Sequence, residues 1–166
     1  MSSRYLLDTN VIITGSHTYP PDVFPGYWGL LESLQSSGRL LLCQSVFDEI
    51  RPAGDLASQW VIDHFPQDDI LKITDVTLSG YGSVVEWARA KNNPRYLDEA
   101  LREFADYSKA DAWLVAHAKE HFLTILTNET SSPHKQKRVK IPDAAQSQGI
   151  NCVSMLELMR RENIRF

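Results

Sequence analysis

Cysteines are scarce in this chain, and its histidines do not form the HExxH zinc motif. Cys43 and Cys152 are the two cysteines among 166 residues, and each lies within a short apolar run without a CxxC pair. The five histidines show no HExxH spacing. These patterns argue against a disulfide framework and a cysteine-based zinc site. The isolated thiols are typical of small buried side chains in a reducing compartment.

Long apolar runs and an excess of positive charge are also absent. No run approaches the ~18 apolar residues that a membrane span requires. The first apolar stretch is interrupted by Asp8, unlike the core of a secretory signal. The net charge of −4 excludes a broadly basic nucleic-acid-binding protein but leaves room for a local basic patch. We therefore expect a soluble, cytoplasmic protein without a membrane partner.

The hydrophobic fraction of 43% and the length predict one domain, residues 1–166, with a substantial core. Short apolar runs predict strands at 5–7, 40–43, 70–73, 123–126 and 151–153. Helical patterns lie between them at 27–36, 45–64, 84–90, 98–107, 108–121 and 155–162. This alternation predicts an α/β fold with a mainly parallel sheet. Loops are expected at 16–27, 78–83 and 128–143.

Acidic side chains stand where these elements begin or end. Asp8 ends the first strand, and Glu129 directly follows the strand at 123–126. Two more acids, Asp48 and Glu49, fall in the first turn of the predicted helix at 45–64, and Asp111 begins a strongly apolar helix. In open parallel sheets, ligands bind beyond the carboxyl ends of the strands. We therefore treat these acids as candidate site residues.

Structural roles are open for several of the acids. The motifs SVFD (45–48) and SKAD (108–111) have the spacing of a capping box, in which the acid accepts a hydrogen bond from a free backbone N–H. Asp8 has the position of an N-cap for a helix that begins near Asn10. However, a charge beside two apolar runs is costly unless it is paired or bound to a metal. The adjacent Thr9 and Asn10 indicate a polar pocket, which capping does not require.

Four motifs carry these acids, in the order YLLDTNVII, SVFDEI, KADAWLVAHA and TILTNE. Their order and spacing resemble those of PIN-domain nucleases, the superfamily of the VapC-type toxins of bacterial toxin–antitoxin pairs. The resemblance covers nearly the whole chain. The late sequence is similar to a small bacterial branch with a longer stretch between the last acid and the last strand. A three-layer α/β/α, Rossmann-like PIN fold with a central, mainly parallel sheet is implied.

The resemblance also implies catalytic and metal-binding roles. Asp8 matches the first metal ligand of the superfamily, and Glu49 matches the second acid. Asp111 matches the third acid, and Glu129 matches the fourth. The implied cofactor is Mg²⁺ or Mn²⁺, and hard oxygen ligands of this kind select those ions. Clustered carboxylates also repel one another, so we expect raised pKa values among them in the absence of metal.

Supporting residues and rival acids follow from the same resemblance. Asn10 lies close to the implied site, and Thr127 stands where a hydroxyl group often supports it. Asp143 is a second candidate for the fourth acid. Asp106 is a candidate for an extra acid near the third position, although it precedes Asp111 by five residues.

The implied activity is metal-dependent hydrolysis of RNA phosphodiester bonds by an endoribonuclease, the toxin of a toxin–antitoxin pair. The implied partners are an RNA substrate, a cognate antitoxin and a second copy in a homodimer. A cluster of cations, Lys135, Lys137, Arg138 and Lys140, follows Glu129 closely. It is either a phosphate-binding patch or a solvated loop.

Two other functions remain open from the residues alone. In a non-catalytic α/β binding module, the acids would serve as caps and surface charge. In an aspartyl-phosphate phosphotransferase or phosphatase, Asp8 would be the nucleophile. Such folds usually place a second acid next to the nucleophile or two residues after it, and here the latter position is Asn10.

Overall fold

The computed structural model describes residues 2–165 and has a parallel sheet at its centre. Its strands are β1 (Tyr5–Leu7), β2 (Leu40–Leu41), β3 (Thr124–Leu126) and β4 (Cys152–Val153). They are ordered β2-β1-β3-β4, and every pairing is parallel. The central strand, β1, pairs Leu6 with Leu41 on one side and with Ile125 on the other. The predicted α/β class with a parallel sheet is therefore confirmed.

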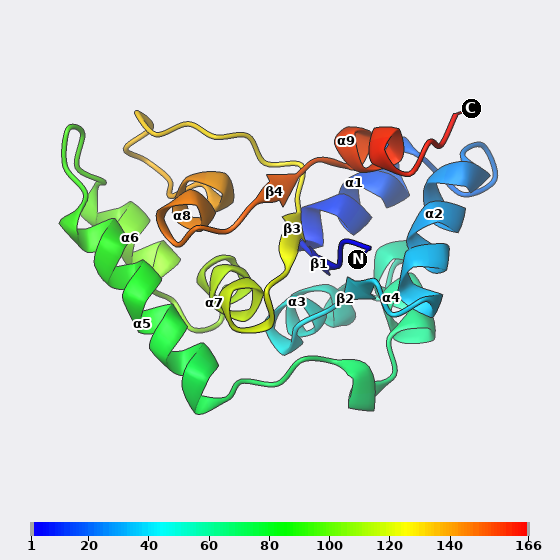
Figure 1. Ribbon diagram of the computed structural model, residues 1–166, viewed down its shortest axis with the longest axis horizontal. Coiled ribbons are helices and arrows are strands. Elements are labelled where there is room, and N and C mark those ends of the chain that lie inside the picture. Colours follow the sequence, from blue (N-terminus) through cyan, green and yellow to red (C-terminus); the bar gives the residue numbers. More distant parts are fainter. Residues whose placement is uncertain (1, 166) are drawn as a thin grey trace.

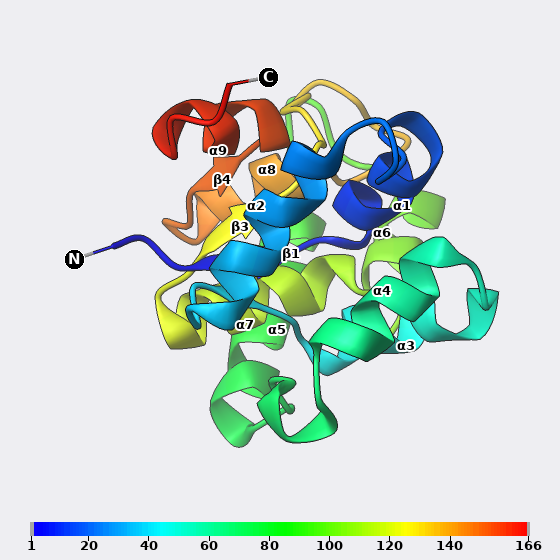
Figure 2. The ribbon, with the colours of Figure 1, turned by 90° about the vertical axis from the view of Figure 1, so that its right-hand side faces the viewer.

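Helices flank both faces of the sheet. They are α1 (Thr9–Thr18), α2 (Pro25–Ser36), α3 (Gln44–Ile50), α4 (Leu56–His64), α5 (Asp75–Ala90), α6 (Asp98–Phe104), α7 (Asp111–His121), α8 (Ile141–Ser147) and α9 (Met155–Arg161), with 3₁₀ turns η1 (Arg51–Ala53) and η2 (Gln67–Asp69). Figure 1 shows α1, α2 and α9 on one side of the sheet and α7 and α8 on the other. Figure 2 shows α2 lying in front of β1. This arrangement agrees with the predicted three layers.

The most buried helix is α7, which lies between the sheet and α5. Its residues 112–118 are all buried, as its continuous apolar sequence requires. On α5, the buried residues Tyr81, Val84, Val85 and Ala88 follow the helical spacing of a face that packs inward. Among residues 2–165, no helix combines the length and apolarity needed to cross a membrane.

The segment 78–83, expected to be a turn because of its two glycines, lies inside α5. A reciprocal capping box between Thr74 and Thr77 starts this helix, and its apolar face outweighs the low helix propensity of glycine. Gly80 lies against α7, where an added Cβ would be 3.4 Å from the Cα of Ala116. Gly80 therefore packs directly against α7, at a distance where an added Cβ would make van der Waals contact.

Other predicted boundaries were also wrong. The helix expected at 45–64 is divided by η1, because Pro52 and the left-handed Gly54 (φ 65°) interrupt it. The strand expected at 70–73 is reduced to a single bridge between Leu71 and Cys43. The loops expected at 16–27 and 128–143 are shorter than predicted, because α1, α2 and α8 extend into them.

Gly15 and Gly29 provide a test of the packing beneath α1. A Cβ at Gly15 would lie 2.7 Å from the Tyr27 ring, which is buried and whose hydroxyl donates to the Val11 carbonyl at 2.8 Å. We expect Gly15→Ala to lower the free energy of unfolding by about 1–3 kcal/mol. An added Cβ at Gly29 would have no described atom within 4 Å. Gly29→Ala should therefore raise the free energy of unfolding by about 0.5–1 kcal/mol, because alanine loses less backbone entropy in a helix than glycine. Equal effects in urea denaturation would contradict this packing.

Candidate functional site

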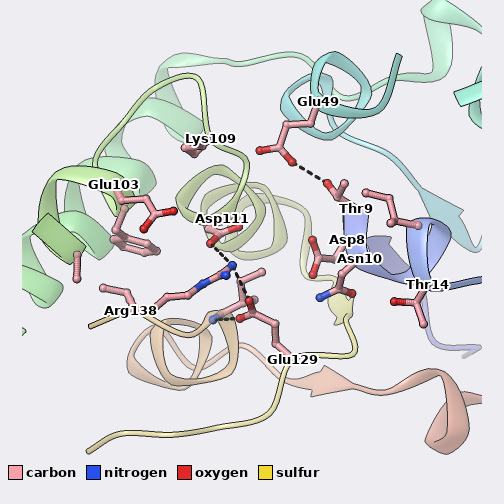
Figure 3. Close-up of a pocket in the computed structure, with 15 residues that line it drawn as sticks. Asp8, Thr9, Asn10, Thr14, Glu49, Glu103, Lys109, Asp111, Glu129 and Arg138 are labelled. Atoms are coloured by element: carbon pink, nitrogen blue, oxygen red, sulfur yellow. Dashed lines mark hydrogen bonds and ion pairs between the residues drawn. The ribbon is translucent and has the colours of Figure 1, made fainter. Parts of the chain in front are cut away.

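The register of β1 and β3 brings Asp8 and Thr127 together at the carboxyl edge of the sheet. The Asp8 N–H donates to the Leu126 carbonyl at 3.0 Å, and the Thr127 hydroxyl donates to Asp8 Oδ2 at 2.7 Å. Asp8 is 3% exposed. Its backbone precedes α1 as an N-cap does, but its side chain makes no capping hydrogen bond. Simple capping therefore does not explain the carboxylate, which Figure 3 shows directed into a cavity.

Asn10, in the first turn of α1, joins this helix to the end of β3. Its Nδ2 donates to the Thr127 hydroxyl at 3.3 Å, and its Oδ1 accepts from the Asn128 N–H at 3.0 Å. The Thr127 hydroxyl also accepts from the Glu129 N–H at 3.1 Å. Asn10 and Thr127 thus hold the chain around Asp8 in place.

Glu49, in α3, links this helix to the starts of α1 and α7 through its two carboxylate oxygens. Oε2 accepts from the Thr9 hydroxyl at 2.8 Å, and Oε1 accepts from the Ala110 N–H at 2.9 Å. Glu49 lies in the last turn of α3, not in a first turn, because α3 begins at Gln44. The capping box predicted at 45–48 is also wrong, since Ser45 lies inside the helix and Asp48 accepts from the Gln44 side chain.

Asp111 is the first residue of α7, and its side chain faces the cavity. The capping box predicted at 108–111 is wrong, because the Ser108 hydroxyl donates to Asp106 at 2.7 Å. This contact keeps the Asp106 carboxylate in the loop before α7. Asp106 does not line the cavity that contains Asp111.

Glu129 follows β3 and is fixed on two sides. Its Oε2 accepts from the Ile141 N–H at the start of α8 at 2.8 Å, and its Oε1 accepts from Arg138 at 2.9 Å. The same Arg138 nitrogen lies 3.5 Å from Asp111 Oδ2. Arg138 therefore bridges the third and fourth predicted acids, as Figure 3 shows.

The structure places the rival acid Asp143 elsewhere. Its carboxylate accepts from the Ser131 hydroxyl and from the Ser132 N–H, and it lines a separate hollow beside Trp87 and Lys91. These two hydrogen bonds hold the loop before α8 in place. Glu129, not Asp143, faces the cavity with the other acids.

The predicted basic patch only partly reaches the cavity. Among its four cations, Arg138 lines the cavity, whereas Lys135, Lys137 and Lys140 lie outside the lining. Lys109, adjacent to the start of α7, provides a second cation in the lining.

The cavity has a volume of about 290 Å³ and gathers acids from separate segments. Asp8, Glu49, Asp111 and Glu129 all line it (Figure 3). Glu103 from α6 is a fifth acid in the lining. Sequence reasoning missed Glu103 because it lies within an ordinary charged helix, and its local pattern does not distinguish it from neighbouring acids.

Two of these carboxyl groups have strongly shifted acidities. The pKa of Asp8 is raised to about 7, mainly by burial and less by the nearby Asp111, Glu129 and Glu49, against the lowering effect of the Thr127 hydrogen bond. Burial and then Glu129 raise the pKa of Asp111 to about 6, although Arg138 opposes them. The expected rise in pKa is present, but burial is its largest cause. A divalent cation would compensate for both burial and repulsion, so this all-oxygen donor set fits Mg²⁺ or Mn²⁺.

The fold and this site define an α/β protein with a carboxylate-lined cavity at the carboxyl edge of a parallel sheet. The chain belongs to the family described as Domain of unknown function (DUF4411), whose sequence profile matches residues 5–166. No curated protein matches the chain.

Proposed function

We propose that this protein is a metal-dependent endoribonuclease that hydrolyses RNA phosphodiester bonds. The observation that carries the proposal is the convergence of Asp8, Glu49, Asp111 and Glu129 on one cavity. These acids come from four separate segments, and two of them have pKa values near neutrality. Such an arrangement is costly unless a cation balances the charge.

The residues of the cavity divide into two functional groups. We assign the direct contacts to Mg²⁺ or Mn²⁺ to Asp8 and Asp111, whose pKa values are raised. Hydrogen bonds orient Glu49 and Glu129 in the same lining. When bound, such an ion supplies charge neutralisation at the scissile phosphate and lowers the pKa of attacking water. Arg138 and Lys109 offset the negative charge of the cavity and offer contacts to phosphate oxygens.

The motif order supports a more specific assignment. Its resemblance to PIN-domain nucleases favours RNA as the substrate and a toxin role in a toxin–antitoxin pair. On the same basis we propose a cognate antitoxin and a homodimer as partners. A neighbouring small gene that encodes a DNA-binding protein would support the antitoxin assignment.

RNA cleavage by the purified full chain tests this proposal. We expect cleavage in Mg²⁺ or Mn²⁺, its loss on addition of EDTA, and its recovery when excess metal is restored. Mn²⁺ should also raise the melting temperature, because binding to the folded state stabilises it. A lack of both cleavage and metal stabilisation would favour the binding-module alternative. A beryllofluoride adduct on Asp8 would instead favour the phosphotransferase alternative.

A further inference from the structure

A second group of potential metal ligands lies at the opposite end of α7 from Asp111. It consists of His117, Glu120 and His121. These positions are related as i, i+3 and i+4, so they share one face of the helix. Each can offer one ligand atom such that all three atoms lie within 4.8 Å of one another. The acidic cavity does not include any of the three residues.

His117 has the least conventional environment in this group. It is 0% exposed, and neither Nδ1 nor Nε2 has a hydrogen-bond partner among residues 2–165. Leaving a buried polar atom unpaired is unfavourable, because the atom loses its hydrogen bonds to water on folding and gains none in return. Its ring lies nearly parallel to that of His121, with an interplanar angle of 13° and centroids 6.2 Å apart. A ligand between these side chains would explain an otherwise unfavourable buried imidazole.

Glu120 is already oriented by residues at the start of α5. Its Oε1 accepts from the Thr74 hydroxyl at 2.7 Å, and its Oε2 accepts from the Thr77 hydroxyl. Oε2 also lies 3.6 Å from Nε2 of His121. Metal-binding side chains are commonly oriented by outer hydrogen bonds of this kind. Glu120 therefore has a defined position, and its oxygens retain lone pairs for a cation.

We propose that His117, Glu120 and His121 form a site for a divalent transition-metal ion of the Zn²⁺ class. Two imidazoles and one carboxylate favour such an ion over Mg²⁺, in contrast to the all-oxygen cavity. Tetrahedral ligands around Zn²⁺ lie roughly 3.4 Å apart, so from separations of 4.8 Å or less each pair of ligand atoms would approach by at most about 1.4 Å. His121 is 32% exposed, which allows a water molecule to complete the coordination. All three ligands belong to α7, and the hydrogen bonds that Glu120 accepts from Thr74 and Thr77 would connect the ion to the start of α5.

Zn²⁺ binding to the full chain tests this site separately from the acidic cavity. We would measure it by calorimetry and elemental analysis in an Asp8→Asn background, which weakens the other candidate site. We expect one Zn²⁺ per chain and an increase in melting temperature. His121→Gln should weaken binding by at least about 100-fold, since even outer partners of metal ligands contribute 10–100-fold.

His134→Gln is a matched control because it removes an exposed histidine outside the group. It should bind Zn²⁺ as tightly as the parent. Should His117→Gln fail to fold, the intensity of the visible bands of Co²⁺ bound to the parent protein would report tetrahedral coordination, and a change of these bands in His121→Gln would report histidine ligation. Absence of Zn²⁺ binding, or equal binding after His121→Gln, would overturn the proposal and identify His117 as a buried core residue without a metal. Neither result depends on RNA cleavage.

Discussion

Replacing Asp8 by asparagine is expected to reduce RNA cleavage by at least about 100-fold while the chain remains folded. Loss of an outer partner commonly costs 10–100-fold, and Asp8 is proposed as a direct metal ligand. Asparagine keeps the size of the side chain and an oxygen that can accept from the Thr127 hydroxyl. It removes the negative charge on which cation binding depends. Initial cleavage rates of a labelled RNA, measured across Mg²⁺ and Mn²⁺ concentrations, would quantify the loss.

Two acids outside the cavity provide matched controls for this variant. Asp48 is exposed and adjacent to Glu49, while Asp143 is buried but faces the loop before α8. Asp48→Asn and Asp143→Asn should retain cleavage in proportion to the folded protein present. Full activity in Asp8→Asn would contradict the proposed function. Loss of activity in a fully folded Asp143→Asn protein would instead support the alternative fourth acid.

Metal-free Asp8→Asn should be more stable than the wild type at pH 8, with the difference disappearing toward pH 4. Asp8 has a pKa raised from 3.8 to about 7 in the folded protein. The folded state therefore binds more protons than the unfolded state in this interval, and wild-type stability falls as pH rises through it. The full shift corresponds to about 4 kcal/mol. We expect about 2 kcal/mol in practice, since relaxation around the ionised group reduces the penalty.

Comparison of the two proteins isolates the contribution of Asp8. Burial lowers the pKa of His117 to about 4, so this group makes the protein less stable as pH falls from 6.5. That opposing trend is present in both chains and cancels in the difference. Urea denaturation in EDTA across pH 4–8 would measure the difference in stability between the two proteins. In a separate experiment without EDTA, saturating Mn²⁺ should reverse this difference, because Mn²⁺ stabilises the wild type more. A difference independent of pH would contradict the raised pKa of Asp8.

Local sequence predicted the sheet better than it predicted the helix boundaries. The runs that became β1 and β3 are buried, apolar and bounded by polar residues, so their strand character is visible locally. The glycines in α5 resembled a turn because the close approach of Gly80 to α7 is a tertiary contact. The sequence of α8 carries start and stop signals for a helix, although its start was predicted to be a loop. Pro142 stands in its first turn, and Gly149 lies beyond its end in a left-handed conformation.

Site residues could be predicted from the sequence where they lie at the predicted end of a strand or the predicted start of a helix. Positions at element boundaries indicate Asp8, Asp111 and Glu129 but leave Asp48 and Glu49 as alternatives. The resemblance to PIN-domain nucleases favours Glu49, and the structure brings the four acids to one cavity. The choice between Glu129 and Asp143 required knowledge of how α8 packs. Glu103 reaches the cavity through tertiary placement alone, which a single sequence does not encode in a readable pattern. Lys109 is different, because it lies two residues before Asp111 and enters the lining with it.

The pairing of β1 with β3 also determines when the site can form during synthesis. Asp8 and its partner Thr127 are separated by 119 positions, and Glu129 depends on the N–H of Ile141. Because the ribosome produces the N-terminal part first, a nascent chain that already contains Asp8, Glu49 and Asp111 still lacks β3 and the start of α8. The complete cavity therefore becomes available only late in translation. For an enzyme proposed to cleave RNA, this means that the first three acids are synthesised before the chain can become active.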